Sequence, residues 1–76
     1  MNPRVEKVIP QPNYILDLTF TNGEQKKFNV STYLEKGIFK ELKNKDLFYT
    51  ATVQYGTVCW ENGLDLCPDT LYLDSN

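Results

Sequence analysis

The side chains best suited to chemistry are crowded into the last quarter of the chain, where Trp60 and Tyr72 are interspersed with the carboxylates Glu61, Asp65, Asp69 and Asp74. A carboxylate and a tyrosine can transfer protons without histidine. Trp60, Asp65, Asp69 and Tyr72 are therefore the candidate ligand-binding or partner-binding residues. The carboxylates lack the Asp-x-Asp-x-Asp-Gly spacing that converges oxygens on calcium, and Asp69 can act as a helix cap. Asp65 is the best functional candidate among them, because aspartate is disfavoured in the middle of a strand.

Composition excludes classical self-contained hydrolysis and argues against a metal site. The 76 residues include no histidine, and Ser31 and Ser75 are the only serines, so Ser/His/Asp and Cys/His constellations cannot form within one chain. Cys59 and Cys67 are eight residues apart, whereas zinc sites use closer cysteine pairs and four ligands. We expect two reduced, structural thiols, no catalytic residue, no metal and no cofactor.

Charge is distributed unevenly along the sequence. All eight lysines and arginines lie in residues 1–45, whereas residues 46–76 contain five acidic residues and no basic one. One interpretation is a basic patch that meets an acidic partner or phosphates, with Lys36, Lys40, Lys43 and Lys45 as its candidates. The other is a set of solubilising lysines. The net charge of −2 and a single arginine argue against a dedicated nucleic-acid surface, which favours arginine and a strongly basic balance.

Strand alternation around two Asn-Gly dipeptides, Asn22-Gly23 and Asn62-Gly63, predicts two hairpins. In each case a three-residue loop is the one that places the apolar residues of both strands on the same face. This predicts Phe28 opposite Leu16 in the first half, and Trp60 opposite Leu64 in the second. Tyr55-Gly56 is expected to form a two-residue turn that sets Val53 opposite Val58. A further strand is expected from Arg4 to Ile9, ended by the turn-forming segment 10–13.

Short helical turns are expected between the two halves and at the end of the chain. The capping-box spacing of Thr32 and Glu35 predicts a turn over Tyr33 to Lys36, and the spacing of Phe39 and Leu42 predicts a second amphipathic one. Asp46 and Asp69 are expected to cap the remaining two. Residues 1–76 are therefore predicted to form one α+β domain, in which two antiparallel β-meanders of about six short strands flank short helical turns.

Several short motifs together resemble a known family. They are Pro3-Arg4-Val5, Phe20-x-Asn22-Gly23-Glu24, Leu34-x-Lys36-Gly37-Ile38-Phe39 followed by Leu42, Gly56-Thr57-Val58 leading to Trp60, Asn62-Gly63, Asp65, and Pro68-Asp69-Thr70-Leu71-Tyr72. As a set they are similar to the small bacterial family known as domain of unknown function 2442. The resemblance implies a compact α+β domain and no activity. It also implies short members beside toxin-like or antitoxin-like genes, and longer members joined to a helix-turn-helix domain that this chain does not carry.

Three functional hypotheses follow. The leading one is a non-enzymatic protein-interaction or regulatory module, associated with a toxin-antitoxin-like pair or acting by self-association. The alternative is a small-ligand-binding or catalytic domain with a site around Trp60, Asp65, Asp69 and Tyr72. The third is weak nucleic-acid binding through the lysine segment, although direct contact with nucleic acid is not expected. Because the sequence has neither a long apolar run nor a signal-peptide core, we expect a cytoplasmic protein without membrane contact.

Overall fold

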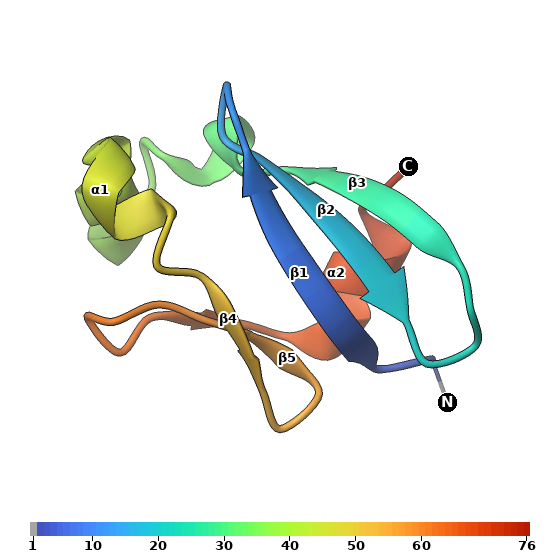
Figure 1. Ribbon diagram of the computed structural model, residues 1–76. Coiled ribbons are helices and arrows are strands. Elements are labelled where there is room, and N and C mark those ends of the chain that lie inside the picture. Colours follow the sequence, from blue (N-terminus) through green and yellow to red (C-terminus); the bar gives the residue numbers. More distant parts are fainter. Residues whose placement is uncertain (1) are drawn as a thin grey trace.

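Two antiparallel meanders of three strands each make up the computed structural model, which describes residues 2–76 (Figure 1). The strands are β1 (Val5–Gln11), β2 (Ile15–Phe20), β3 (Gln25–Asn29), β4 (Thr52–Gln54), β5 (Thr57–Cys59) and β6 (Asp65–Leu66). The helices are the 3₁₀ helices η1 (Val30–Tyr33) and η2 (Gly37–Lys43) and the α-helices α1 (Lys45–Phe48) and α2 (Pro68–Leu73). The order of strands in the two sheets is β1-β2-β3 and β4-β5-β6. The α+β fold class with six short strands is confirmed.

The first hairpin has the predicted register. Leu16 faces Phe28, and backbone hydrogen bonds from Gly23 to Phe20 and from Phe20 to Glu24 close the three-residue loop. Gly23 has a φ of +89°, the left-handed conformation that glycine adopts without a steric penalty. Strand β1 runs two residues beyond its predicted end. Pro10 pairs with Leu16 at the edge of the sheet, a position where a proline is tolerated because its missing N–H is not needed by the ladder.

The second meander also has the predicted register. Val53 faces Val58, Val58 faces Leu66, and Trp60 N–H donates to Leu64 C=O across the Asn-Gly loop. The two-residue turn has positive φ values of 54° at Tyr55 and 78° at Gly56, as a type I′ turn requires.

The helical turns are present, but three of the expected caps are wrong. Asn29 caps η1 through its side-chain oxygen, which accepts from Ser31 N–H, so that this turn begins directly after β3 rather than at Thr32. Asn44 caps α1 in the same way, and Asp46 lies inside the helix. Helix α2 has no side-chain cap, since Pro68 at its first turn fixes the backbone and Asp69 follows within that turn.

The meanders form two separate sheets that share one core. Strand β1 crosses over the β4–β5 hairpin, and α2 covers the inner face of β1-β2-β3 (Figure 1). A backbone hydrogen bond from Val5 to Gly56 joins the sheets. The largest fully buried side chains come from both halves of the chain and are Phe20, Phe28, Phe48, Leu16, Leu18, Leu42, Leu71, Val30 and Val58.

Candidate functional site

Trp60, the largest of the predicted site residues, is a core residue. Its side chain is 4% exposed, and the indole Nε1–H donates to the carbonyl oxygen of Phe48 at 3.0 Å. This bond attaches the second sheet to α1 and satisfies the polar atom of a buried ring. Trp60 therefore presents no surface to a ligand.

The two candidate aspartates are exposed, unlike Trp60. Asp65 is exposed on the outer side of β6, opposite Cys59. Asp69 is exposed in the first turn of α2, where its Oδ1 accepts from the side-chain amide of Asn2 at 3.3 Å. Of the four predicted residues, none lines the three surface hollows described below. The structure does not bring them together around one cavity.

Tyr72 belongs to a polar cluster that fastens α2 to the first hairpin. The phenol donates to Glu24 Oε1 at 2.9 Å, and Asn22 donates to the same oxygen. Lys26 Nζ lies 3.8 Å from the centroid of the Tyr72 ring and 3.6 Å from the other oxygen of Glu24. The hydrogen bond from Tyr72, followed by the one from Asn22, holds the pKa of Glu24 below its ordinary value. The same hydrogen bond is the main reason that the pKa of Tyr72 is raised.

Both cysteines are free. Burial, reinforced by the negative charge of Asp65, raises the pKa of the Cys59 thiol. A raised pKa lowers the fraction of nucleophilic thiolate at neutral pH. Cys67 is exposed and carries the N-cap backbone position of α2. The partial burial of Cys59 agrees with a structural residue, whereas the exposed side chain of Cys67 is not part of the core.

The four lysines of the predicted basic patch lie on or next to η2 and are interspersed with acids. Lys43 pairs with Glu35, and the amine of Lys36 lies 5.2 Å from the centroid of the Tyr33 ring. Lys40 is exposed on η2, and Lys45 borders a small hollow of about 90 Å³. Because the ion pair with Glu35 also lowers the pKa of that carboxyl, part of the positive charge is neutralised locally.

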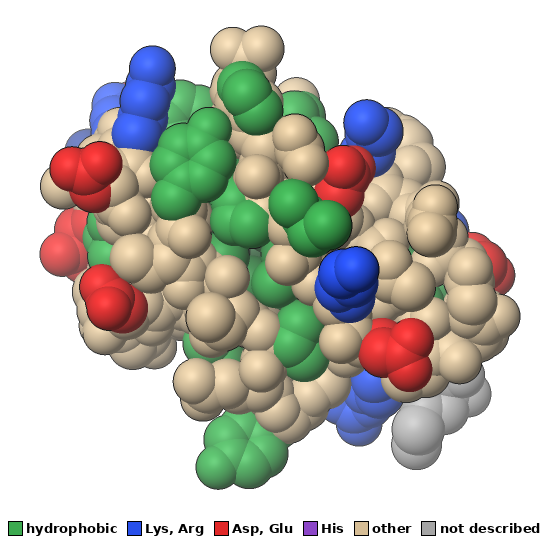
Figure 2. Space-filling model, in the orientation of Figure 1, with side chains coloured by type: hydrophobic (Ala, Val, Ile, Leu, Met, Phe, Trp, Pro, Cys, Tyr) green, Lys and Arg blue, Asp and Glu red, His purple; other side chains and the backbone are tan. Residues whose placement is uncertain are grey.

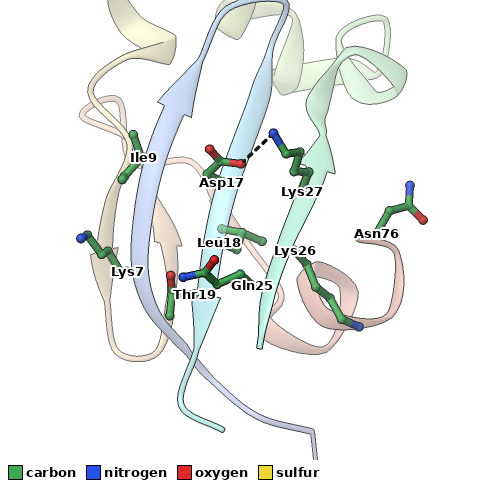
Figure 3. Close-up of a pocket in the computed structure, with 9 residues that line it drawn as sticks. All are labelled: Lys7, Ile9, Asp17, Leu18, Thr19, Gln25, Lys26, Lys27 and Asn76. Atoms are coloured by element: carbon green, nitrogen blue, oxygen red, sulfur yellow. Dashed lines mark ion pairs between the residues drawn. The ribbon is translucent and has the colours of Figure 1, made fainter. Parts of the chain in front are cut away.

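The largest of the three hollows lies on the outer face of β1-β2-β3. It has a volume of about 470 Å³. Figure 3 shows its lining side chains coming from all three strands and from Asn76 beyond β3. At its centre Lys27 and Asp17 form an ion pair at 3.5 Å. Lys7 lies at one side of the hollow and Lys26 at the other. The third hollow lies at the opposite end of β3, between Tyr33 and Asp74.

Hydrophobic side chains reach solvent along the line where the two sheets meet. Figure 2 shows them spread from the end of the molecule that carries the β1–β2 turn down to the tip of the β4–β5 hairpin. We use the name apolar seam for a set of exposed or half-buried apolar residues of the neighbouring strands β1 and β4 and of the segments next to β4; they are Ile9 and Pro10 on β1, Val53 on β4, Tyr49 shortly before β4 and Tyr55 directly after it.

The Tyr55-Gly56 pattern predicts Tyr55 only as a turn residue. Its side chain is 95% exposed. This exposure has a signal in the sequence: tyrosine occupies a turn position where asparagine, aspartate or glycine is the usual residue.

Within residues 2–76, no three side chains of the His, Cys, Asp or Glu type lie close enough together to hold a metal ion. None of the helices in this range has the length and apolar character needed to cross a lipid bilayer.

Comparison with known proteins gives a family and no activity. Neither the curated proteins nor the solved structures include a match. The family described as protein of unknown function (DUF2442) matches residues 5–75, which is nearly the whole chain. The chain therefore belongs to the DUF2442 family.

Proposed function

We propose that the chain is a non-enzymatic protein-interaction or regulatory module of the bacterial cytoplasm, and that it contacts its protein partner through the apolar seam. The observation that carries the proposal is the position of Tyr55. Its ring is almost fully exposed at the tip of the β4–β5 hairpin, on a residue with a φ of 54°.

Neither turn geometry nor the core accounts for a tyrosine there. Left-handed backbone is costly for a bulky residue, and Asn-Gly is the favoured pair in this turn type. An exposed ring buries no surface that would offset that cost. Tyrosine does, however, supply a rigid amphipathic contact at protein interfaces. A partner that covers Tyr55 would give this residue a function.

The rest of the seam extends the same surface. Ile9 is 44% exposed and Tyr49 is 48% exposed. Val53 is half-buried on β4, which lies beside β1. Apolar residues grouped along one line are typical of docking surfaces, whereas isolated ones are ordinary. The resemblance to short members found beside toxin-like or antitoxin-like genes adds one setting in which such a partner would be encoded.

The test is affinity capture of the tagged chain from lysate of its source, with and without nuclease, read by mass spectrometry. The seam variant is Ile9→Thr with Tyr55→Asn. Asparagine before Gly56 restores the preferred turn pair, so we expect the variant to melt no lower than the single variant Ile9→Thr.

The matched control is Ile38→Thr with Leu73→Ser, because these two residues are 64% and 67% exposed outside the seam. We expect the wild type and the control to capture the same nuclease-resistant protein in stoichiometric amount, and the seam variant to lose it. Equal capture by both variants would refute a role for the seam. Capture that disappears with nuclease would point to nucleic acid instead.

A further inference from the structure

The outer edge of β3 already holds a piece of extended backbone. Lys27 and Asn76 exchange two backbone hydrogen bonds, with N···O distances of 2.7 Å and 2.9 Å. Such a reciprocal exchange is the hydrogen-bonded pair of an antiparallel ladder. Asn76 therefore acts as one residue of a fourth strand beside β3, at the border of the 470 Å³ hollow (Figure 3).

The hydrogen-bonding pattern along β3 shows which of its backbone groups face away from the sheet. Glu24 C=O accepts from Phe20 N–H on β2, so residues 24, 26 and 28 direct their backbone groups toward β2. Residues 25, 27 and 29 then direct theirs away from the sheet. Only the middle one of these three, Lys27, pairs with Asn76 among the described residues. A longer extended segment would form more bonds here than Asn76 does.

The opposite edge of the sheet is less suited to strand addition. On β1, Pro10 has no N–H to donate, and Val5 N–H is already bonded to Gly56 C=O on the other sheet. Prolines and local coverage are the features that protect sheet edges from pairing. The β3 edge has no proline. Within the described chain, its coverage is limited to Asn76 beside Lys27 and to the hydroxyl of Thr32, which donates to Asn29 C=O at 3.3 Å.

Charge indicates which segment fits. The side chain of Lys27 is 70% exposed on the outer face, where its amine pairs with Asp17 at 3.5 Å; the amine of Lys26 lies over the Tyr72 ring. A second copy of this chain, paired antiparallel about Lys26 or Lys27, would place lysine directly opposite lysine, which is destabilising. A carboxylate opposite Lys27 would instead give its exposed amine a second acidic partner, on the side away from Asp17.

We propose that the β3 edge is a docking site for an extended, acidic segment of a partner protein, which replaces Asn76 as the neighbour of Lys27. The inference rests on the proposed function in taking the partner to be a protein. The docking edge lies on the side of the hollow opposite Ile9, the one residue of the apolar seam that lines it (Figure 3). The mode of recognition is β-augmentation, in which main-chain hydrogen bonds provide affinity and alternate side chains provide specificity.

The test uses the full chain labelled with ¹⁵N and three capped pentapeptides. The first is Thr-Val-Glu-Val-Thr, the second has lysine at the centre, and the third is the glutamate peptide with an N-methylated central residue. We expect saturable shifts at the amides of Gln25, Lys27 and Asn76 with the glutamate peptide. It should bind about two- to five-fold more tightly than the lysine peptide, as cross-strand charge pairs allow. The N-methylated peptide should not bind.

Two variants make the result specific. Asn76→Pro removes the N–H that competes for Lys27 C=O, and it should strengthen binding of the glutamate peptide at least about two-fold. Lys27→Gln keeps the backbone edge and should abolish the preference for glutamate. Absence of saturable shifts in both wild type and Asn76→Pro would overturn the inference, as would shifts confined to the apolar seam. Either result leaves the seam test unaffected, because that test reads capture of an intact protein.

Discussion

Replacing Trp60 by phenylalanine tests whether this residue is a structural part of the core. The change removes the hydrogen bond from Nε1 to Phe48 C=O, whose net contribution is about 1 kcal/mol. Phe48 C=O keeps Ala51 N–H as a partner at 3.4 Å, so no further penalty for an orphaned acceptor is added. The smaller ring also leaves unfilled a space of about two carbon atoms, which costs about 1.5 kcal/mol in lost burial.

We therefore expect Trp60→Phe to lower the free energy of unfolding by about 2.5 kcal/mol. Domains of this size have urea slopes near 1 kcal/mol per molar, so the midpoint should fall by about 2.5 M. The melting temperature should fall by about 10–20 °C. Far-UV circular dichroism is the suitable readout, because the substitution removes the only tryptophan.

The control is Tyr55→Phe, whose hydroxyl lies on a ring that is 95% exposed. It should leave the urea midpoint unchanged within about 0.5 M. If the urea midpoint of Trp60→Phe falls by less than about 0.5 M, with an unchanged slope, the inference that Trp60 stabilises the core is refuted. That result would reopen the hypothesis that the indole serves a ligand.

Two further predictions concern the turns and the cluster around Tyr72. Gly56→Ala should lower the melting temperature more than Gly23→Ala. Both residues have positive φ, which costs about 1–2 kcal/mol for alanine, but a Cβ at Gly56 would lie 3.0 Å from the Cβ of Arg4, whereas one at Gly23 meets nothing within 4 Å. Equal losses of melting temperature would contradict the close approach of Arg4 to Gly56. The hydrogen bond between Tyr72 and Glu24 should make stability depend on pH at both extremes. Because the pKa of Glu24 is lowered in the folded state, its contribution is present above the ordinary value of 4.5 and is lost as the pH falls below it. Because the pKa of Tyr72 is raised from 10.0, its contribution is present below pH 10 and is lost as the pH rises above it. The melting temperature of Tyr72→Phe should therefore be below that of the wild type at pH 7 and should approach it at pH 3 and pH 11. A constant difference in melting temperature across this range would show that the hydrogen bond between Tyr72 and Glu24 does not contribute.

Local chemistry was sufficient to predict the strands and their pairing. Asn-Gly loops and two-residue alternation specify which face of each strand is buried, and a slip of one residue would turn every apolar side chain to solvent. The pairs Leu16–Phe28 and Val58–Leu66 follow from this condition alone. The helix caps were predicted less well: an asparagine just before η1 and another just before α1 take the place of the residues expected to cap them, and α2 begins at Pro68 with no side-chain cap.

Contacts between distant parts of the chain were decided by the tertiary structure. The indole of Trp60 finds its acceptor on a helix formed twelve residues earlier. Tyr72 meets Glu24 across 48 positions, and Asn76 reaches the edge of β3. No local pattern specifies such partners, since they depend on how α2 packs against the first sheet and on where β1 crosses the second.

The sequence by itself therefore determined the two meanders and excluded the familiar catalytic constellations, because turn chemistry, strand alternation and the residue inventory are local properties. Packing of the two sheets decided which polar residues are buried, that the β3 edge is accessible, and that Tyr55 is exposed to solvent. These depend on the joint burial of side chains from both halves of the chain.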